Sequence, residues 1–277
     1  MSRLEMPRLG QGTWYLGDSP QTRQREIDAL RAGIEAGAVM IDTAEMYGEG
    51  RSELLVGEAI RPYDREKLFL VSKAYPHHGD VRGLSRSCEK SLSRLGTDYL
   101  DLYLLHWRGA VPLEETIEGM EQLRQRGLIR AWGVSNFDTD DMQELLALPG
   151  GDACAVDQVL YHLGSRGAEY SLFPLLRKHG VLPMAYCPLA QGGALRQGIL
   201  DSPAVREVAQ RHGASPAQVL LAFVLSWPEM RAVPKAATRF HAQENAAALQ
   251  IALTGEERVL LDRAYPAPDH KTYLDIV

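Results

Sequence analysis

The sequence has few cysteines, no long apolar run and no excess of positive charge. Its three cysteines, Cys88, Cys154 and Cys187, are too few and too scattered for a disulfide framework or a cysteine-based zinc site. The longest apolar run, 219–225, is far too short to span a bilayer. The formal net charge of −6 leaves no basic stripe for nucleic acid. Charges and a proline occupy the first eight residues, where a secretory signal needs an apolar run. We therefore expect a cytoplasmic protein that binds neither nucleic acid nor membrane.

Motifs that bind nucleotides or metals are also missing. No G-x-G-x-x-G segment follows a predicted strand, which argues against a Rossmann dinucleotide site, and there is no P-loop. His77 and His78 are adjacent and would point apart on a strand, so no histidine or cysteine cluster has metal-ligand spacing. We predict no metal site.

What the sequence does have is a regular alternation of short apolar runs with amphipathic stretches. The runs recur at intervals of about 30 residues, the length of one strand plus one crossover helix. Eight such units in roughly 250 residues is the count of a (β/α)8 TIM barrel. No linker divides the chain, so we predict a single domain over 1–277. The longer last interval is expected to hold a flexible stretch, 190–198, and an extra helix. The predicted strands are 9–13, 38–42, 68–73, 100–106, 128–134, 154–159, 181–186 and 231–234.

Helix-boundary signals agree with this placement. A periodic stretch over 21–36 ends at a glycine, as many helices do. Ser215 precedes a proline that can occupy the first position of a helix. Thr254 and Glu257 have the spacing of a capping box at the start of a last helix.

Four titratable residues fall at or just after the ends of predicted strands. Asp42, Lys73 and His106 end the second, third and fourth strands, and Tyr47 lies five residues after Asp42. TIM barrels place their active sites at the C-terminal ends of the strands, so these four side chains should converge there. Each alone has an ordinary structural explanation, such as turn chemistry for Asp42. Their joint placement favours an active site.

The four groups together have the chemistry of a proton donor. A free tyrosine titrates near 10, and we expect Lys73 to lower the pKa of the Tyr47 phenol by about 2 units, or roughly 2.7 kcal/mol. Asp42 would hold the buried lysine in its charged form. His106 would donate a hydrogen bond to an oxygen on which charge develops. This combination suits a carbonyl group that is being reduced.

Seven stretches, in order along essentially the whole chain, resemble the aldo-keto reductase superfamily. Within it, the stretch 161–167 (YHLGSRG) is similar to a bacterial branch associated with methylglyoxal reduction. The resemblance implies a TIM barrel that reduces aldehydes and ketones with NAD(P)H, and it implies that Tyr47 is the general acid of a tetrad with Asp42, Lys73 and His106. The matching stretches are 10–14 (GQGTW), 41–48 (IDTAEMYG), 71–73 (VSK), 98–107 (DYLDLYLLHW), 133–137 (GVSNF), 185–189 (AYCPL) and 234–235 (PK).

The resemblance also implies a site for the nicotinamide end of the cofactor. Ser135, Asn136 and Gln158 would hold the carboxamide, and Tyr186 would stack on the ring. Without the resemblance, strand-end capping and barrel packing would explain these residues. The segment 187–192 would cover the pyrophosphate, with a cysteine where serine is common. Further cofactor residues implied on this side are Thr13, Trp14, Cys187, Pro188, Leu189 and Gln191.

Lys235 would pair with the 2′-phosphate of NADPH. His241 stands where many members of the superfamily carry an arginine, and whether Arg239 replaces that arginine stays open. We therefore expect NADPH as the cofactor, with NADH possible. Without the resemblance, the region would be a solvated helix start. Further residues implied at the adenine end are Ala236, Thr238, Glu244 and Asn245.

The substrate side is implied by aromatic residues at pocket positions, Trp14, Tyr75 and Trp107. The short tail 265–277 suggests an open pocket for small carbonyl compounds, in a monomer or weak oligomer. Two alternatives stay open. One is a cofactor-binding module that senses redox state with little turnover. The other is an aldolase or isomerase in which Lys73 forms a Schiff base.

Overall fold

Eight parallel strands form the wall of a barrel. The structure is a computed structural model and describes residues 5–277. Its strands pair in chain order, each parallel to the next, and the bridges Leu9–Ala232 and Gly12–Lys235 bring β8 back against β1. This arrangement confirms the predicted TIM barrel. The strands are β1 (Gly10–Gly12), β2 (Met40–Asp42), β3 (Phe69–Ala74), β4 (Leu100–Leu105), β5 (Ile129–Ser135), β6 (Val156–Leu160), β7 (Leu182–Tyr186) and β8 (Arg231–Val233).

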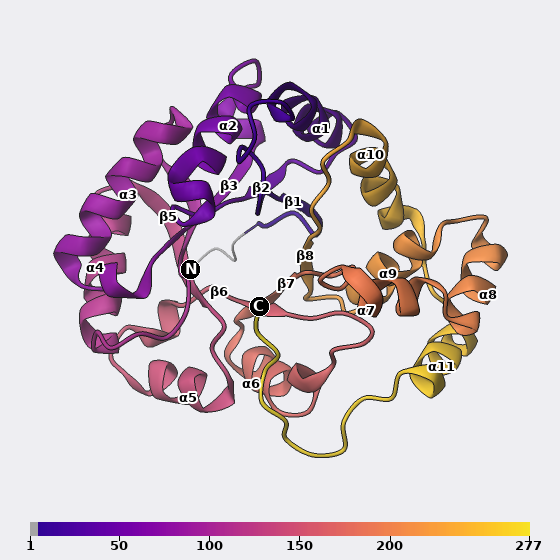
Figure 1. The fold of residues 1–277 in the computed structure, drawn as a ribbon. Helices are drawn as coiled ribbons and strands as arrows, with labels where there is room; N and C mark the ends of the chain where they lie inside the picture. The colour runs from indigo at the N-terminus through magenta and orange to yellow at the C-terminus, as the bar shows by residue number, and fades with distance from the viewer. Residues whose placement is uncertain (1–4) are drawn as a thin grey trace.

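The predicted strands closely overlap the observed ones because each apolar run is covered on both faces. Every residue of β3 and of β4 is buried, as expected for a parallel strand between a barrel interior and an outer layer of helices. Figure 1 looks into the barrel and shows that outer ring. The helices are α1 (Arg23–Glu35), α2 (Arg51–Ile60), α3 (Val81–Leu95), α4 (Leu113–Gln125), α5 (Thr139–Ala147), α6 (Leu172–His179), α7 (Gly193–Leu200), α8 (Pro203–His212), α9 (Pro216–Leu225), α10 (Arg239–Ala247) and α11 (Gly255–Ala264).

The predicted helix boundaries hold. Gly37 follows α1 with a φ of 94°, a left-handed conformation that favours glycine. Ser215 before α9 and Thr254 before α11 each form a capping box with the residue three positions later. The stretch 190–198, which we expected to be flexible, contains most of α7. Along residues 5–277, no helix is both long enough and apolar enough to cross a membrane.

The two adjacent histidines do not lie on a strand, which corrects one expectation. They belong to a 3-10 turn, Pro76–His78, that directly follows β3. Their rings do not point apart, because the ring centroids are 4.2 Å from each other. His78 Nδ1 lies 2.9 Å from the buried carboxylate of Glu45, which ties this turn to the loop after β2.

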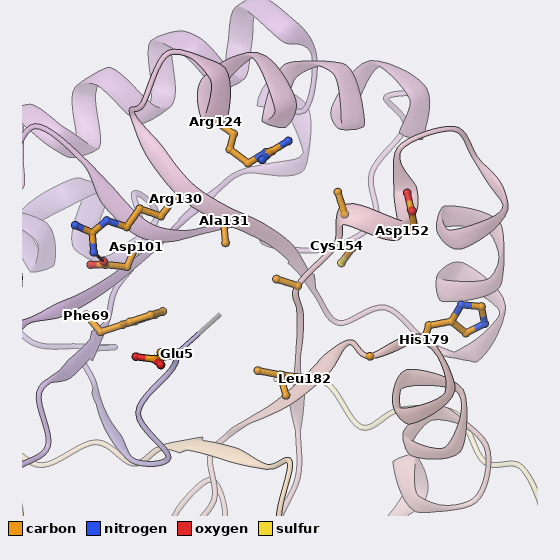
Figure 2. A pocket seen from close by; sticks show the side chains of 13 residues that line it. Glu5, Phe69, Asp101, Arg124, Arg130, Ala131, Asp152, Cys154, His179 and Leu182 are labelled. Atoms are coloured by element: carbon orange, nitrogen blue, oxygen red, sulfur yellow. Dashed lines mark hydrogen bonds and ion pairs between the residues drawn. The ribbon is translucent and has the colours of Figure 1, made fainter. Parts of the chain in front are cut away.

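A hollow of about 640 Å³ lies among the N-terminal ends of the strands, at the end of the barrel opposite to the predicted site (Figure 2). Phe69 and Leu182, the first residues of β3 and β7, line it. Its arginines already have partners: Arg130 lies 3.0 Å from Asp101, and Arg124 pairs with Glu121. This end of the barrel therefore carries structural ion pairs.

One buried carboxyl group on β6 has no such partner. Asp157 is fully buried, and neither of its side-chain oxygens has a hydrogen-bond partner among the described residues. Burial raises the pKa of Asp157 well above its ordinary value. Folding at neutral pH must therefore either protonate this carboxyl or bury its charge.

We expect Asp157→Asn to stabilise the protein. Folding raises the pKa of this carboxyl, so the folded state holds the proton more tightly than the unfolded state does. The wild type should therefore lose stability as pH rises from about 4, the ordinary pKa of an aspartate. An unsatisfied buried group costs about 1–3 kcal/mol and a charged one costs more; the asparagine amide cannot ionise, so its gain should be of this order. Thermal unfolding at about pH 5 and about pH 7.5 checks this. The gain should be larger at the higher pH, and a variant less stable than wild type there would contradict the prediction.

Candidate active site

A buried ion pair lies at the C-terminal ends of β2 and β3. Lys73 Nζ is 2.8 Å from both carboxylate oxygens of Asp42 and 3.0 Å from the carbonyl oxygen of Thr43. Lys73 is 0% exposed and Asp42 is 3% exposed. Burial lowers the pKa of Lys73, and the negative charge of Asp42 opposes that change. Asp42 thus favours the charged ammonium, as the sequence led us to expect.

The phenol of Tyr47 lies beside this pair. Tyr47 begins the 3-10 turn that follows β2, and its oxygen is 3.3 Å from Lys73 Nζ. A lysine ammonium has only donors, so the phenol oxygen accepts this hydrogen bond and the phenol hydrogen is free for another acceptor. The geometry therefore suits a tyrosine that gives up its own proton.

The expected lowering of the Tyr47 pKa is wrong for this structure. Burial is the largest influence and raises the pKa of Tyr47 well above 10, and the negative charge of Asp42 raises it further. The cation of Lys73 does not outweigh these two effects. Tyr47 is therefore fully protonated near pH 7, which is the form that a proton donor requires.

His106 directly follows β4 and faces the same phenol. Its ring lies edge-on to the Tyr47 ring, with 5.7 Å between the centroids. Burial, and then the charge of Lys73, lowers the pKa of His106 well below 6.5. The imidazole is therefore neutral at pH 7 and keeps one N–H donor. The structure thus brings all four predicted tetrad residues together.

The residues predicted to hold the carboxamide lie next to the tetrad. Gln158 Nε2 donates to Asp42 Oδ1 at 2.8 Å, and Ser135 Oγ donates to the main-chain oxygen of Gln158 at 2.8 Å. The Tyr186 hydroxyl donates to Asn136 Oδ1 at 2.8 Å. These contacts extend one polar network from the ends of β5, β6 and β7 to the buried ion pair.

A cavity of about 490 Å³ opens over the tetrad. Trp14 and Trp107, two of the predicted substrate residues, line it, but Tyr75 does not. Tyr75 packs edge-on against Trp107, with 6.1 Å between ring centroids, and so lies behind the cavity wall. The lining residues are Trp14, Met46, Tyr47, His106, Trp107, Arg108, Ser135, Asn136, Asp141, Gln158, Tyr186, Ile276 and Val277.

The C-terminal tail covers one side of this cavity, which corrects the expectation of an open pocket. The tail runs from α11 back to the middle of the barrel (Figure 1). Ser165 Oγ donates to Asp275 at 2.5 Å, and Lys271 Nζ lies 2.7 Å from Asp140. These contacts hold the tail so that Ile276 and Val277 reach the cavity.

A second cavity of about 240 Å³ adjoins the first and shares Trp14, Tyr47 and Tyr186 with it. It leads from the tetrad to Lys235. Ala190 belongs to the segment 187–192 that the resemblance placed at the pyrophosphate, whereas the sequence analysis gave Tyr15 and Arg196 no role in cofactor binding. The lining residues are Gly12, Thr13, Trp14, Tyr15, Asp42, Tyr47, Tyr186, Cys187, Pro188, Leu189, Ala190, Gln191, Arg196, Val233, Pro234 and Lys235.

The residues predicted at the adenine end lie beyond this second cavity. Thr238 caps α10 by accepting from the His241 N–H at 3.3 Å. His241 Nδ1 lies 3.1 Å from Glu244, so its side chain already has a partner on α10. Arg239 does not line this cavity. The residues that do not line the cavity are Ala236, Thr238, Arg239, His241, Glu244 and Asn245.

Comparison with known proteins agrees with this geometry. The chain is 55% identical over 274 residues to methylglyoxal reductase YeaE of Escherichia coli, covering 99% of this chain and 96% of that protein. It is 32% identical over 216 residues to an NADH-specific methylglyoxal reductase of the same species, covering 68% of this chain and 65% of that protein.

A solved structure is similar as well. An aldo/keto reductase from Klebsiella pneumoniae, crystallised with NADP and acetate, matches with a TM-score of 0.95 and 53% identity, covering 98% of this chain and 96% of that one. The model of the aldo/keto reductase family matches residues 8–266. The protein described here therefore belongs to the aldo/keto reductase family.

Proposed function

We propose that the protein is an NADPH-dependent reductase of small aldehydes and ketones, with methylglyoxal as the first substrate to test. The observation that carries the proposal is the Lys73 ammonium, held between the Asp42 carboxylate and the Tyr47 phenol. Tyr47 lies where the two cavities meet. The larger cavity is lined by the aromatic substrate residues and by the residues predicted to hold the carboxamide, and the smaller one leads to Lys235. The similarity to a methylglyoxal reductase and to an NADP-bound reductase supports the same activity.

The smaller cavity fits a nicotinamide dinucleotide phosphate in its charge. The charge of Asp42 is offset by its ion pair with Lys73. Lys235 and Arg196 also line the cavity, and neither forms an ion pair within residues 5–277. The lining is therefore positive, as phosphate groups require. When bound, the cofactor supplies a hydride to the substrate carbon.

The protein's own residues then donate one proton and stabilise the charge that develops. In this proposal the Tyr47 O–H donates to the carbonyl oxygen, and the neutral His106 donates a hydrogen bond to the same atom. As the phenol loses its proton, the Lys73 ammonium stabilises the resulting phenolate. Ile276 and Val277 of the tail offer an apolar surface that excludes water from the same cavity.

The alternatives fit less well. A redox-sensing module with little turnover has no support from the relatives, which are named as reductases. A Schiff base requires a neutral, accessible amine, whereas Lys73 is fully buried and paired with a carboxylate. We further propose that the enzyme is cytoplasmic and acts as a monomer or weak oligomer on a small carbonyl substrate.

Replacing the proton donor should remove most of the activity. We expect Tyr47→Phe to lower kcat for methylglyoxal about 10²–10⁴-fold, the usual contribution of general acid catalysis. NADPH binding, followed by fluorescence, should persist because the ring stays in place. A Tyr47→Phe protein with wild-type turnover would show that another group supplies the proton.

The pH dependence of reduction follows from two shifted groups. Burial lowers the pKa of His106 well below 6.5, so the imidazole stays neutral as pH falls to that value. Burial raises the pKa of Tyr47 well above 10, so the phenol keeps its proton as pH rises toward that value. We expect kcat for reduction to be flat from about pH 6.5 to about pH 9. A fall centred near pH 8 would contradict the assignment of Tyr47.

Cofactor preference should depend on Lys235. Only NADPH carries a 2′-phosphate, and a hydrogen bond to a charged group is worth about 1.5–3 kcal/mol, which is roughly tenfold to more than a hundredfold in affinity. Lys235→Ala should therefore weaken NADPH binding by that factor and leave NADH binding unchanged. Dissociation constants for both cofactors check this. Because the ion pair would be exposed, added salt should weaken NADPH binding more than NADH binding. A variant that retains its preference would place the phosphate elsewhere.

A further inference from the structure

Tyr15 is an exposed aromatic residue at the smaller cavity that the proposed reaction leaves without a role. It is 58% exposed and has a φ of 65°, in the left-handed region. Its ring stacks on Trp14, with 4.6 Å between centroids and 17° between planes. Trp14 in turn stacks on the Tyr47 ring at 6.3 Å. The Tyr15 ring is therefore fixed to the wall that the two cavities share.

The Tyr15 ring also contacts Lys235. Its Nζ atom lies 5.6 Å from the centroid of the Tyr15 ring, within the range of a cation–π interaction. No ion pair within residues 5–277 includes Lys235, so the ring is the group that restrains this long, exposed side chain. An ammonium on a four-carbon stem loses rotamer freedom when a ligand fixes it. A residue that restrains the stem beforehand lowers that cost.

The contact with the ring leaves N–H donors of the Lys235 ammonium free to bind an anion. A ring face offers electron density to one side of the cation and leaves the remaining N–H donors for an anion. Tyr15 and Lys235 both line the cavity, so the restrained ammonium lies at its wall. The aromatic stack and the cation therefore form a preorganised anion contact at this end of the cavity.

We propose that Tyr15 is a positioning residue that strengthens the preference for NADPH over NADH by holding Lys235 at the cavity. The inference rests on the proposed function, in which Lys235 meets the 2′-phosphate. NADH lacks that phosphate, so the position of Lys235 affects NADPH alone. Tyr15 acts through Lys235 and not on the reacting atoms.

The test compares two substitutions of Tyr15 with a matched control. Tyr15→Leu removes the aromatic face, whereas Tyr15→Phe keeps it. Tyr170→Leu removes another exposed tyrosine, 49% exposed, that does not line either cavity at the tetrad. Dissociation constants for NADPH and NADH are measured by fluorescence for each purified protein.

We express the preference as the dissociation constant for NADH divided by that for NADPH. Tyr15→Leu should reduce this ratio about two- to fivefold, the range of an exposed cation–π contact, by weakening NADPH binding alone. Tyr15→Phe and Tyr170→Leu should keep the wild-type ratio. An unchanged or increased ratio in Tyr15→Leu, or equal weakening of both cofactors, would overturn the inference.

A double variant separates this inference from the proposed function. In a Lys235→Ala background, Tyr15→Leu should have no further effect on the ratio, because there is no ammonium left to hold. An equal effect in both backgrounds would show that Tyr15 does not act through Lys235. The proposed function fails separately, if the wild type does not prefer NADPH or if Lys235→Ala keeps the preference. Those results would contradict the role of Lys235 at the 2′-phosphate and would not bear on the contact between Tyr15 and Lys235.

Discussion

The site depends on a cation that is buried at the end of a parallel barrel. Lys73 has no exposed surface, and removing an ammonium from water is costly unless a partner offsets its charge. Asp42 on the neighbouring strand supplies that partner, and its carboxylate also accepts from Gln158. The ion pair then influences its other neighbours: it hydrogen-bonds the Tyr47 phenol and disfavours a charge on His106. Burial is the main reason that the tyrosine stays protonated and the histidine neutral, and the charges of Asp42 and Lys73 add to these two effects.

The barrel also determines where the reactants can meet. The two cavities share Trp14, Tyr47 and Tyr186, so a molecule in either one would lie against the same aromatic wall. The polar network at the ends of β5, β6 and β7 borders this wall, and the tail closes one side of it. Proximity between a hydride donor and a carbonyl would therefore follow from the shape of the barrel mouth.

The sequence predicts the barrel and the tetrad well because both depend on local order. A strand covered on both faces is continuously apolar, and side chains at successive strand ends must meet at one end of a closed barrel. The pKa of Tyr47 was beyond such reasoning, because it depends on how deeply the phenol is buried. The tail and Arg196 were missed for other reasons. The tail reaches the site through contacts between segments far apart in the chain, as Ser165 and Asp275 show, and periodicity carries no information on such contacts. Arg196 follows the segment 187–192 closely, but no motif in the sequence marked it.

The central claim is that Lys73 and Tyr47 act as one unit in proton transfer. A double-mutant cycle on kcat for methylglyoxal tests it most directly, with Tyr47→Phe, Lys73→Met and the combined variant, each checked for folding and NADPH binding. Groups that act as a unit show strongly non-additive effects. The account predicts that the double variant is no slower than the slower single variant. Losses that multiply in the double variant, or a Lys73→Met protein with wild-type kcat, would contradict it.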